Sequence, residues 1–250
     1  MDAFDKFQSY LFREVRAIIE PIKEQHMEEL GQTLWNELFD LEGKRVVDRN
    51  LSQRELFFRE VFYIFIEIHA SYIVLKDIEV YIGRFPYSKD NISKVRNLHY
   101  NISNYMNEMY ILKERLSAYL TKIGRLYRKD RRHQKILKLT RPIFKMVSNT
   151  LSGITKIRGI HVHQLRYTDK DLDRLNTLEL LVQTDSIDFF EQFPDFYEFE
   201  YRNVRRKWKK VVKQNNETLR ELFNTYFGAL LKILFDKKGN LIYPQAIGCT

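Results

Sequence analysis

The chain has few of the residues that build turns and disulfides. Its 250 residues include 9 glycines, 5 prolines and 1 cysteine. Because turns use glycine and proline heavily, and β-rich proteins need many turns, this composition favours a few long helices joined by short connections. The lone thiol, Cys249, allows no internal disulfide and no cysteine-based zinc site, which is typical of a reducing compartment. We therefore predict a cytoplasmic, all-α protein.

The sequence also lacks a long uncharged apolar run. The most apolar stretch, residues 56–75, contains Arg59, Glu60 and Glu67. Three charges within one span argue against insertion into a bilayer, so this stretch predicts a buried core helix and no membrane partner. The first residues do not show the basic segment followed by an apolar run that is typical of a signal peptide.

Apolar residues make up 44% of the chain and recur at helical spacing along most of it. Ser52 and Glu55 form the pattern of a capping box, and Asp169 is a candidate helix cap. The spacing predicts helices over residues 4–22, 52–82, 88–129, 132–151, 170–183 and 196–235. We predict a long-helix bundle forming a single domain, 1–250, with a helical decoration at 1–50 and a loosely ordered tail at 236–250.

Basic residues outnumber acidic ones, and the formal net charge is +9. Two clusters stand out, and their candidate RNA-binding residues are Arg128, Arg131 and Arg132 in the first, and Arg205, Arg206, Lys209, Lys210 and Trp208 in the second. Cations can hold phosphates, and the interleaved rings of Tyr127, Tyr201 and Trp208 could stack bases. The alternative is a solvated helix face whose aromatic side chains pack inward.

One short segment gathers residues suited to acid–base chemistry on RNA. Arg158, His161 and His163 lie within six positions. An imidazole can take or give a proton near neutral pH, and a guanidinium can stabilise the charge that develops on a phosphate. Phosphate-binding glycine loops, metalloprotease and serine-hydrolase motifs and clustered acidic residues are missing from the sequence, so we predict no metal and no cofactor.

This segment resembles the HEPN superfamily, whose signature is an arginine followed after four to six residues by a histidine, here Arg158 and His163. The resemblance covers the motif and the helices around it, residues 90–185, and the predicted core that carries the motif spans residues 88–185. It implies a four-to-five-helix core, a homodimer in which two motifs face each other, and, in catalytic members, metal-independent RNA cleavage.

The helical period sets a condition on this motif. Residues five positions apart point roughly 140° apart on an ideal helix, so Arg158 and His163 meet only if the backbone bends or a second subunit contributes. The alternative is that both histidines flank a buried Val162 and have a structural role. Arg128 and His133 show the same spacing within a basic run.

These observations predict a HEPN-like, RNA-directed protein, acting as a metal-independent endoribonuclease that leaves 2′,3′-cyclic phosphate ends. The alternative is a non-catalytic helical module that binds RNA or a protein partner, or that dimerises as a scaffold through the helix predicted at 88–129.

Overall fold

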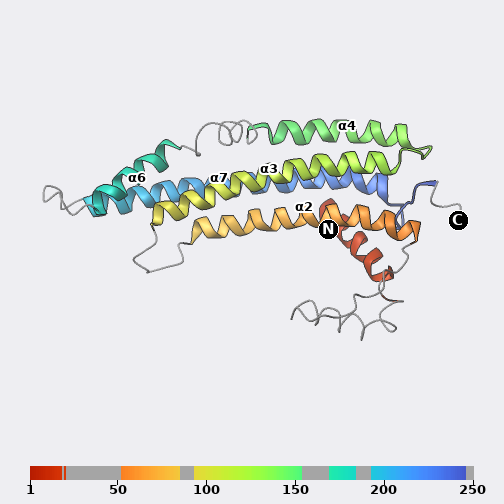
Figure 1. Cartoon of the computed structure of the whole chain (residues 1–250), viewed down its shortest axis with the longest axis horizontal. Coiled ribbons are helices and arrows are strands. Elements are labelled where there is room, and N and C mark those ends of the chain that lie inside the picture. The colour runs from red at the N-terminus through yellow and green to blue at the C-terminus, as the bar shows by residue number, and fades with distance from the viewer. Residues whose placement is uncertain (19, 21–51, 85–92, 154–168, 184–192, 246–250) are drawn as a thin grey trace, which may run out of the picture. The chain divides into compact units, whose positions relative to one another are not determined.

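The computed structural model describes residues 1–18, 20, 52–84, 93–153, 169–183 and 193–245, and these residues are mostly helical. After an N-terminal helix (residues 3–18), the helices are α2 (Gln53–Gly83), α3 (Lys94–Leu126), α4 (His133–Thr150), α6 (Lys170–Gln183) and α7 (Phe193–Leu234), as Figure 1 shows. The described part of the chain contains no β-strand, only an isolated bridge between Phe235 and Leu241. The all-α prediction is therefore confirmed.

Side chains at the helix starts satisfy backbone N–H groups that have no partner within the helix. At α2, the Ser52 N–H donates to the Glu55 carboxylate over 2.8 Å, and the Glu55 N–H donates to the Ser52 hydroxyl over 3.2 Å. This pair is the predicted capping box. Asp169 accepts from the N–H groups of Asp171 and Leu172, and it caps α6 as expected.

The chain folds into two compact units. Unit 1 is formed by the described residues within 1–64, 121–143 and 223–250. Unit 2 is formed by the described residues within 65–120 and 144–222. The core of unit 1 is largely aromatic. Phe4 and Phe7 of the N-terminal helix pack against Phe227 of α7, with ring centroids 5.0 and 4.8 Å apart. This packing joins the beginning of the chain to its last helix.

A tight turn follows α7 in unit 1. Gly239 has a φ of 82°, a conformation that glycine adopts without a steric penalty. The Asp236 carboxylate accepts from the Asn240 N–H over 2.9 Å, and Arg13 donates to the Gly239 carbonyl. A Cβ atom at Gly239 would lie 2.5 Å from the Tyr10 ring. The turn at residues 236–240 is thus fixed by contacts with the N-terminal helix.

In unit 2, residues of α2, α3 and α7 meet at a buried polar group. The Asn216 amide of α7 donates to the Leu75 carbonyl and to the Glu79 carboxylate of α2, over 3.3 and 2.9 Å. It accepts from the Tyr105 hydroxyl of α3 over 3.1 Å. Because a buried amide is costly unless it is hydrogen-bonded, these contacts fix the register of the three helices.

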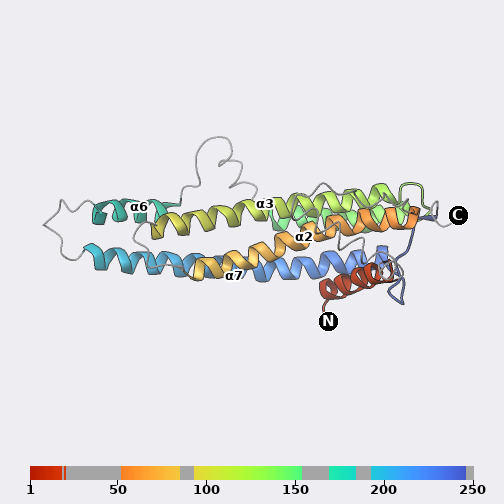
Figure 2. The same cartoon turned by 60° about the horizontal axis from the view of Figure 1, so that its bottom comes forward.

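Helix α6 and the first half of α7 lie side by side in unit 2, as both views show (Figures 1 and 2). The two helices run antiparallel, since Arg174 pairs with Glu200 and, nearer the start of α6, Asp171 pairs with Lys207. The Tyr197 hydroxyl donates to Glu179 over 2.8 Å. These contacts cover one side of α7 and determine which of its side chains reach solvent.

Among the described residues, no helix combines the length and the apolar character that crossing a bilayer requires.

Candidate nucleic-acid interface

The three residues of the predicted catalytic motif, Arg158, His161 and His163, lie outside the described residues, between α4 and α6. The predicted acid–base site therefore stays a prediction from the sequence. Within the described ranges, no group of three or more histidine, cysteine or acidic side chains could hold a metal ion. The basic clusters, in contrast, are described almost completely.

The first half of α7 has one buried face and one basic face. Its buried positions follow each other at steps of three and four residues, and they are Tyr197, Tyr201, Val204, Trp208 and Val212. Such steps bring side chains to one side of a helix, here toward the core of unit 2. Lys207 is exposed but pairs with Asp171 of α6. We call the other exposed cations of this segment the α7 basic face, and it consists of Arg202, Arg206, Lys209, Lys210 and Lys213.

Most of the α7 basic face lies on one narrow line. At 100° per residue, Arg202, Arg206, Lys209 and Lys213 fall within an arc of roughly 60°. With a rise of 1.5 Å per residue, the line from Arg202 to Lys213 is about 16 Å long. The result is a positive track of three helical turns. Because like charges on neighbouring turns repel each other, an anion outside the helix would stabilise them.

Acidic side chains neutralise little of this track. Lys213 has a carboxylate at 4.0 Å, that of Glu217, with both side chains largely exposed, so the pair is weak. Arg202, Arg206 and Lys210 have no ion pair with any residue that the structure describes. The α7 basic face therefore keeps most of its charge for an external anion.

Lys207, beside the α7 basic face, and Lys209, within it, also have contacts inside unit 2. Lys207 pairs with Asp171 of α6 over 2.5 Å, which raises the pKa of the ammonium and lowers that of the carboxyl group. The end of the Lys209 side chain lies beside Gly83, where a Cβ atom would come within 3.2 Å of the lysine Cε and Nζ atoms. Since the carbonyls at a helix C-terminus favour a cation, Lys209 also stabilises the end of α2.

The aromatic rings that the sequence placed beside these cations lie in the core. Trp208 is 6% exposed and Tyr201 is 4% exposed. The Tyr201 ring lies under Lys94 and Arg205. Its centroid is 6.0 Å from the lysine Nζ atom and 5.6 Å from the arginine Cζ atom. Burial raises the pKa of the Tyr201 hydroxyl. Arg205 is thus engaged by a ring of its own helix, and neither ring offers a free face to a base.

A different aromatic residue reaches solvent on this helix. Phe199 is 60% exposed and Phe196 is 49% exposed. Charge density along the sequence does not point to these two residues. Their spacing does, because neither fits the series of three and four residues that marks the buried face. Phe199 precedes Arg202 by three positions, so the ring and the guanidinium are neighbours on the surface of the helix.

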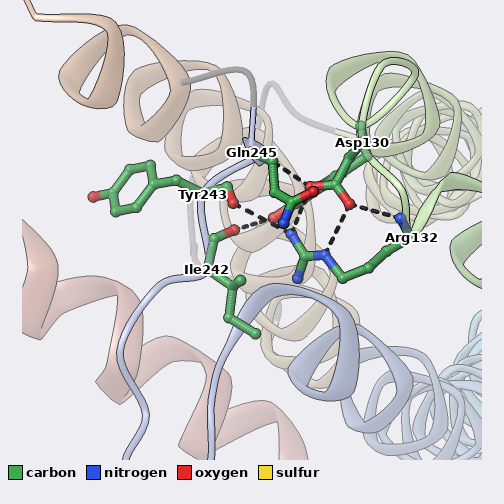
Figure 3. Close-up of polar contacts among 6 residues, drawn as sticks. Asp130, Arg132, Ile242, Tyr243 and Gln245 are labelled. Carbon is green, nitrogen blue, oxygen red and sulfur yellow. Dashed lines mark hydrogen bonds and ion pairs between the residues drawn. The ribbon is translucent and has the colours of Figure 1, made fainter. Parts of the chain in front are cut away.

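The other basic cluster surrounds the turn between α3 and α4 in unit 1, and it is built around a buried acid. The Asp130 carboxylate accepts from the Arg132 backbone N–H over 2.7 Å and from the guanidinium at 3.0 Å (Figure 3). It also accepts from the Gln245 N–H over 3.0 Å. These donors hold the pKa of Asp130 at about 2, below its ordinary value of 3.8. Arg132 also donates to the Tyr243 carbonyl over 3.3 Å.

This network gives the predicted RNA-binding residues of the turn different environments. Arg132 is committed to Asp130 and to the chain end, whereas Arg128 and Arg131 are exposed. Tyr127 is fully buried, donates to the Ile242 carbonyl, and has a raised hydroxyl pKa because of that burial. The turn therefore joins the end of α3 to residues 242–245 and leaves a small number of cations for a ligand.

Comparison of the chain with family models, with curated proteins and with solved structures gives no match.

Proposed function

We propose that this protein binds RNA through the α7 basic face. The supporting observation is the α7 basic face, of which Arg202, Arg206 and Lys210 have no ion pair among the described residues. Phosphate groups are the anions that this face fits, because a nucleic-acid strand repeats them at regular intervals along its length. When these cations contact the phosphates of a strand, the counterions held by the strand are released, and their release drives binding.

Binding to a membrane surface would require a different arrangement of this helix. An amphipathic helix on a bilayer inserts an apolar face between the lipid headgroups. In α7 that face, from Tyr197 to Val212, is buried in unit 2. The exposed large apolar side chains of this segment are Phe196 and Phe199, and two rings do not form the continuous apolar face that insertion requires, which favours a hydrophilic polyanion.

The salt dependence of binding tests the proposal. The measurement is fluorescence anisotropy of a labelled RNA of mixed sequence, titrated at several salt concentrations. We expect the triple variant Arg202→Ala, Arg206→Ala, Lys210→Ala to lose more than about tenfold in affinity at low salt. Because each phosphate contact contributes about 0.7 to the slope for a single strand, the slope of log K against log salt should fall by about 2.

A matched control removes the same charge from other helices of unit 2. Arg96, Lys145 and Lys170 are exposed cations of α3, α4 and α6. Replacing these three by alanine should leave the salt slope nearly unchanged. Equal losses for the two triple variants would mean that net charge and not the α7 basic face determines binding, and binding that does not depend on salt would refute the proposal.

RNA cleavage is a separate proposal that rests on the Arg158, His161 and His163 motif in the sequence. It predicts cleavage that persists in EDTA, produces 2′,3′-cyclic phosphate ends and is lost in His163→Ala. In the homodimer that the resemblance implies, sedimentation should give twice the chain mass. Activity that disappears only on chelation, or that persists in His163→Ala, would contradict this proposal and leave RNA binding intact.

A further inference from the structure

We infer that the α7 basic face selects single-stranded over double-stranded RNA, and that Phe199 is the residue that determines this selectivity. The inference rests on the proposed function and specifies its ligand. Its basis is the position of an exposed aromatic ring at the start of the cation line. The sequence suggested buried rings, Trp208 and Tyr201, for the same task.

The exposure of Phe199 contrasts with that of its neighbours. Tyr197 and Tyr201, two positions away on either side, are 7% and 4% exposed, whereas Phe199 is 60% exposed. The exposed part of a phenylalanine ring does not stabilise the fold, because stabilisation comes from burial of apolar surface. A single exposed apolar side chain needs no explanation, but Phe199 lies directly beside a line of cations and has Phe196 three positions before it.

Helix geometry places the ring and the cations in reach of one strand. Relative to Arg202, Phe199 is rotated by roughly 60° and lies about 4.5 Å further along the axis toward the start of the helix. Arg206 follows Phe199 by seven residues, or about 10 Å. A strand whose phosphates contact the two arginines can therefore turn a base toward Phe199.

The acidic residues near the ring do not block this path. Glu198 forms an ion pair with Lys94, and Glu200 forms one with Arg174 of α6. Both carboxylates are thus neutralised within unit 2. The exposed Asp195 lies at roughly the same angle as Arg202 but two turns nearer the start of the helix, so it limits the track at that end.

The chemistry of stacking gives the selectivity. In a duplex the faces of the bases are covered by their neighbours, and a surface phenylalanine has no base to contact. In a single strand every base has an accessible face, and one base–aromatic stack strengthens binding by roughly fivefold to a hundredfold with little dependence on sequence. Duplex and single strand should therefore share the electrostatic part of binding, and only the single strand should gain from Phe199.

The experiment measures the affinity of the full chain for three polyanions. The probes are a single-stranded RNA of roughly a dozen nucleotides, the matched duplex, and inorganic polyphosphate, which has charge but no bases. We expect the single strand to bind at least about tenfold more tightly than the duplex. Phe199→Ala should lose about tenfold on the single strand, little on duplex or polyphosphate, and none of the salt slope, because no charge is removed.

Two further variants separate stacking from structural effects. Tyr100 of α3 is 63% exposed, so Tyr100→Ala removes a similarly exposed ring from a different helix and should leave all three affinities unchanged. Phe199→Trp should preserve the selectivity. The fluorescence of this variant, after subtraction of the unsubstituted protein's signal, should be quenched by the single strand and not by polyphosphate.

The possible failures are distinguishable. Salt-dependent binding that is equal for single strand and duplex, or a loss in Phe199→Ala that is equal for all three probes, would overturn the inference and leave the proposed function standing. Absence of salt-dependent binding to any RNA would overturn both. Binding to vesicles containing anionic phosphatidylserine, without binding to RNA, would identify a lipid surface as the ligand and would also overturn both.

Discussion

Two basic regions of this protein differ in what their charges are used for. In the turn between α3 and α4, Asp130 is buried and occupies Arg132, so part of the positive charge stabilises the fold of unit 1. On α7, Arg202 and Arg206 are exposed and have no acidic partner among the described residues of the protein. A basic cluster is thus available for a ligand only when the fold does not provide its counter-charge.

The largest expected effect concerns the buried acid. Asp130→Ala removes the acceptor of the Arg132 guanidinium and of the Arg132 and Gln245 backbone N–H groups. Because the half-buried guanidinium then loses its partner, we expect the free energy of unfolding to fall by about 3 kcal/mol. Urea unfolding followed by circular dichroism measures this change.

The control for Asp130→Ala is Arg131→Ala, which removes an exposed charge from the same turn and should change the free energy of unfolding by less than about 0.5 kcal/mol. Equal effects of the two substitutions would show that the Asp130 network does not stabilise unit 1.

Acid should reveal the same network. The pKa of Asp130 is about 2 in the folded protein, below its ordinary value of 3.8. A depressed pKa means that the unfolded chain binds the proton more tightly, so the stabilisation is complete above the ordinary pKa and is lost as the pH falls toward 2. Unfolding midpoints measured between about pH 5 and 2 should decline more steeply for the unsubstituted protein than for Asp130→Ala. Parallel curves would contradict the assignment.

The next effect compares the two regions as ligand sites. The triple variant Arg128→Ala, Lys129→Ala, Arg131→Ala removes the exposed cations of the turn. We expect it to weaken RNA binding by only about twofold to threefold, against more than tenfold for the α7 triple variant, because one turn can contact few phosphates. A larger loss from the turn would assign the main RNA-binding site to unit 1.

The smallest effect concerns an ion pair at the surface. Lys207 and Asp171 are 57% and 31% exposed in their side chains. Since exposed pairs are well solvated before they form, Lys207→Ala should change the free energy of unfolding by less than about 0.5 kcal/mol. A loss comparable to that of Asp130→Ala would mean that burial does not determine how much an ion pair stabilises this protein.

Sequence patterns predicted the helices well for local reasons. The predicted 52–82 and 170–183 correspond to α2 and α6, because the capping box at Ser52 and the cap at Asp169 define where each begins. The predicted start of α3 near residue 88 precedes the observed Lys94, whose cap is Ser93. Serine is common at helix starts and at turns alike, so the sequence does not distinguish Ser88 from Ser93 as the cap.

The candidate site was predictable in its cations and not in its aromatic residues. Arg206, Lys209 and Lys210 were selected from charge density, and the structure places all three on the exposed side of α7. Trp208 and Phe199 are both aromatic residues near cations, and charge density does not distinguish them. Their helical phase does, because the core of unit 2 takes up one face of α7 and leaves the other in solvent.

The sequence by itself determined the all-α class, the capped starts of α2 and α6 and the excess of positive charge, since propensity, capping and charge are properties of neighbouring residues. The packing of helices distant in sequence decided which charges are neutralised and which rings are covered. Asp130 meets Gln245, and Asp171 meets Lys207, only after folding brings their segments together. Burial and ion pairing depend on such contacts, so the division between structural and available cations is a tertiary property.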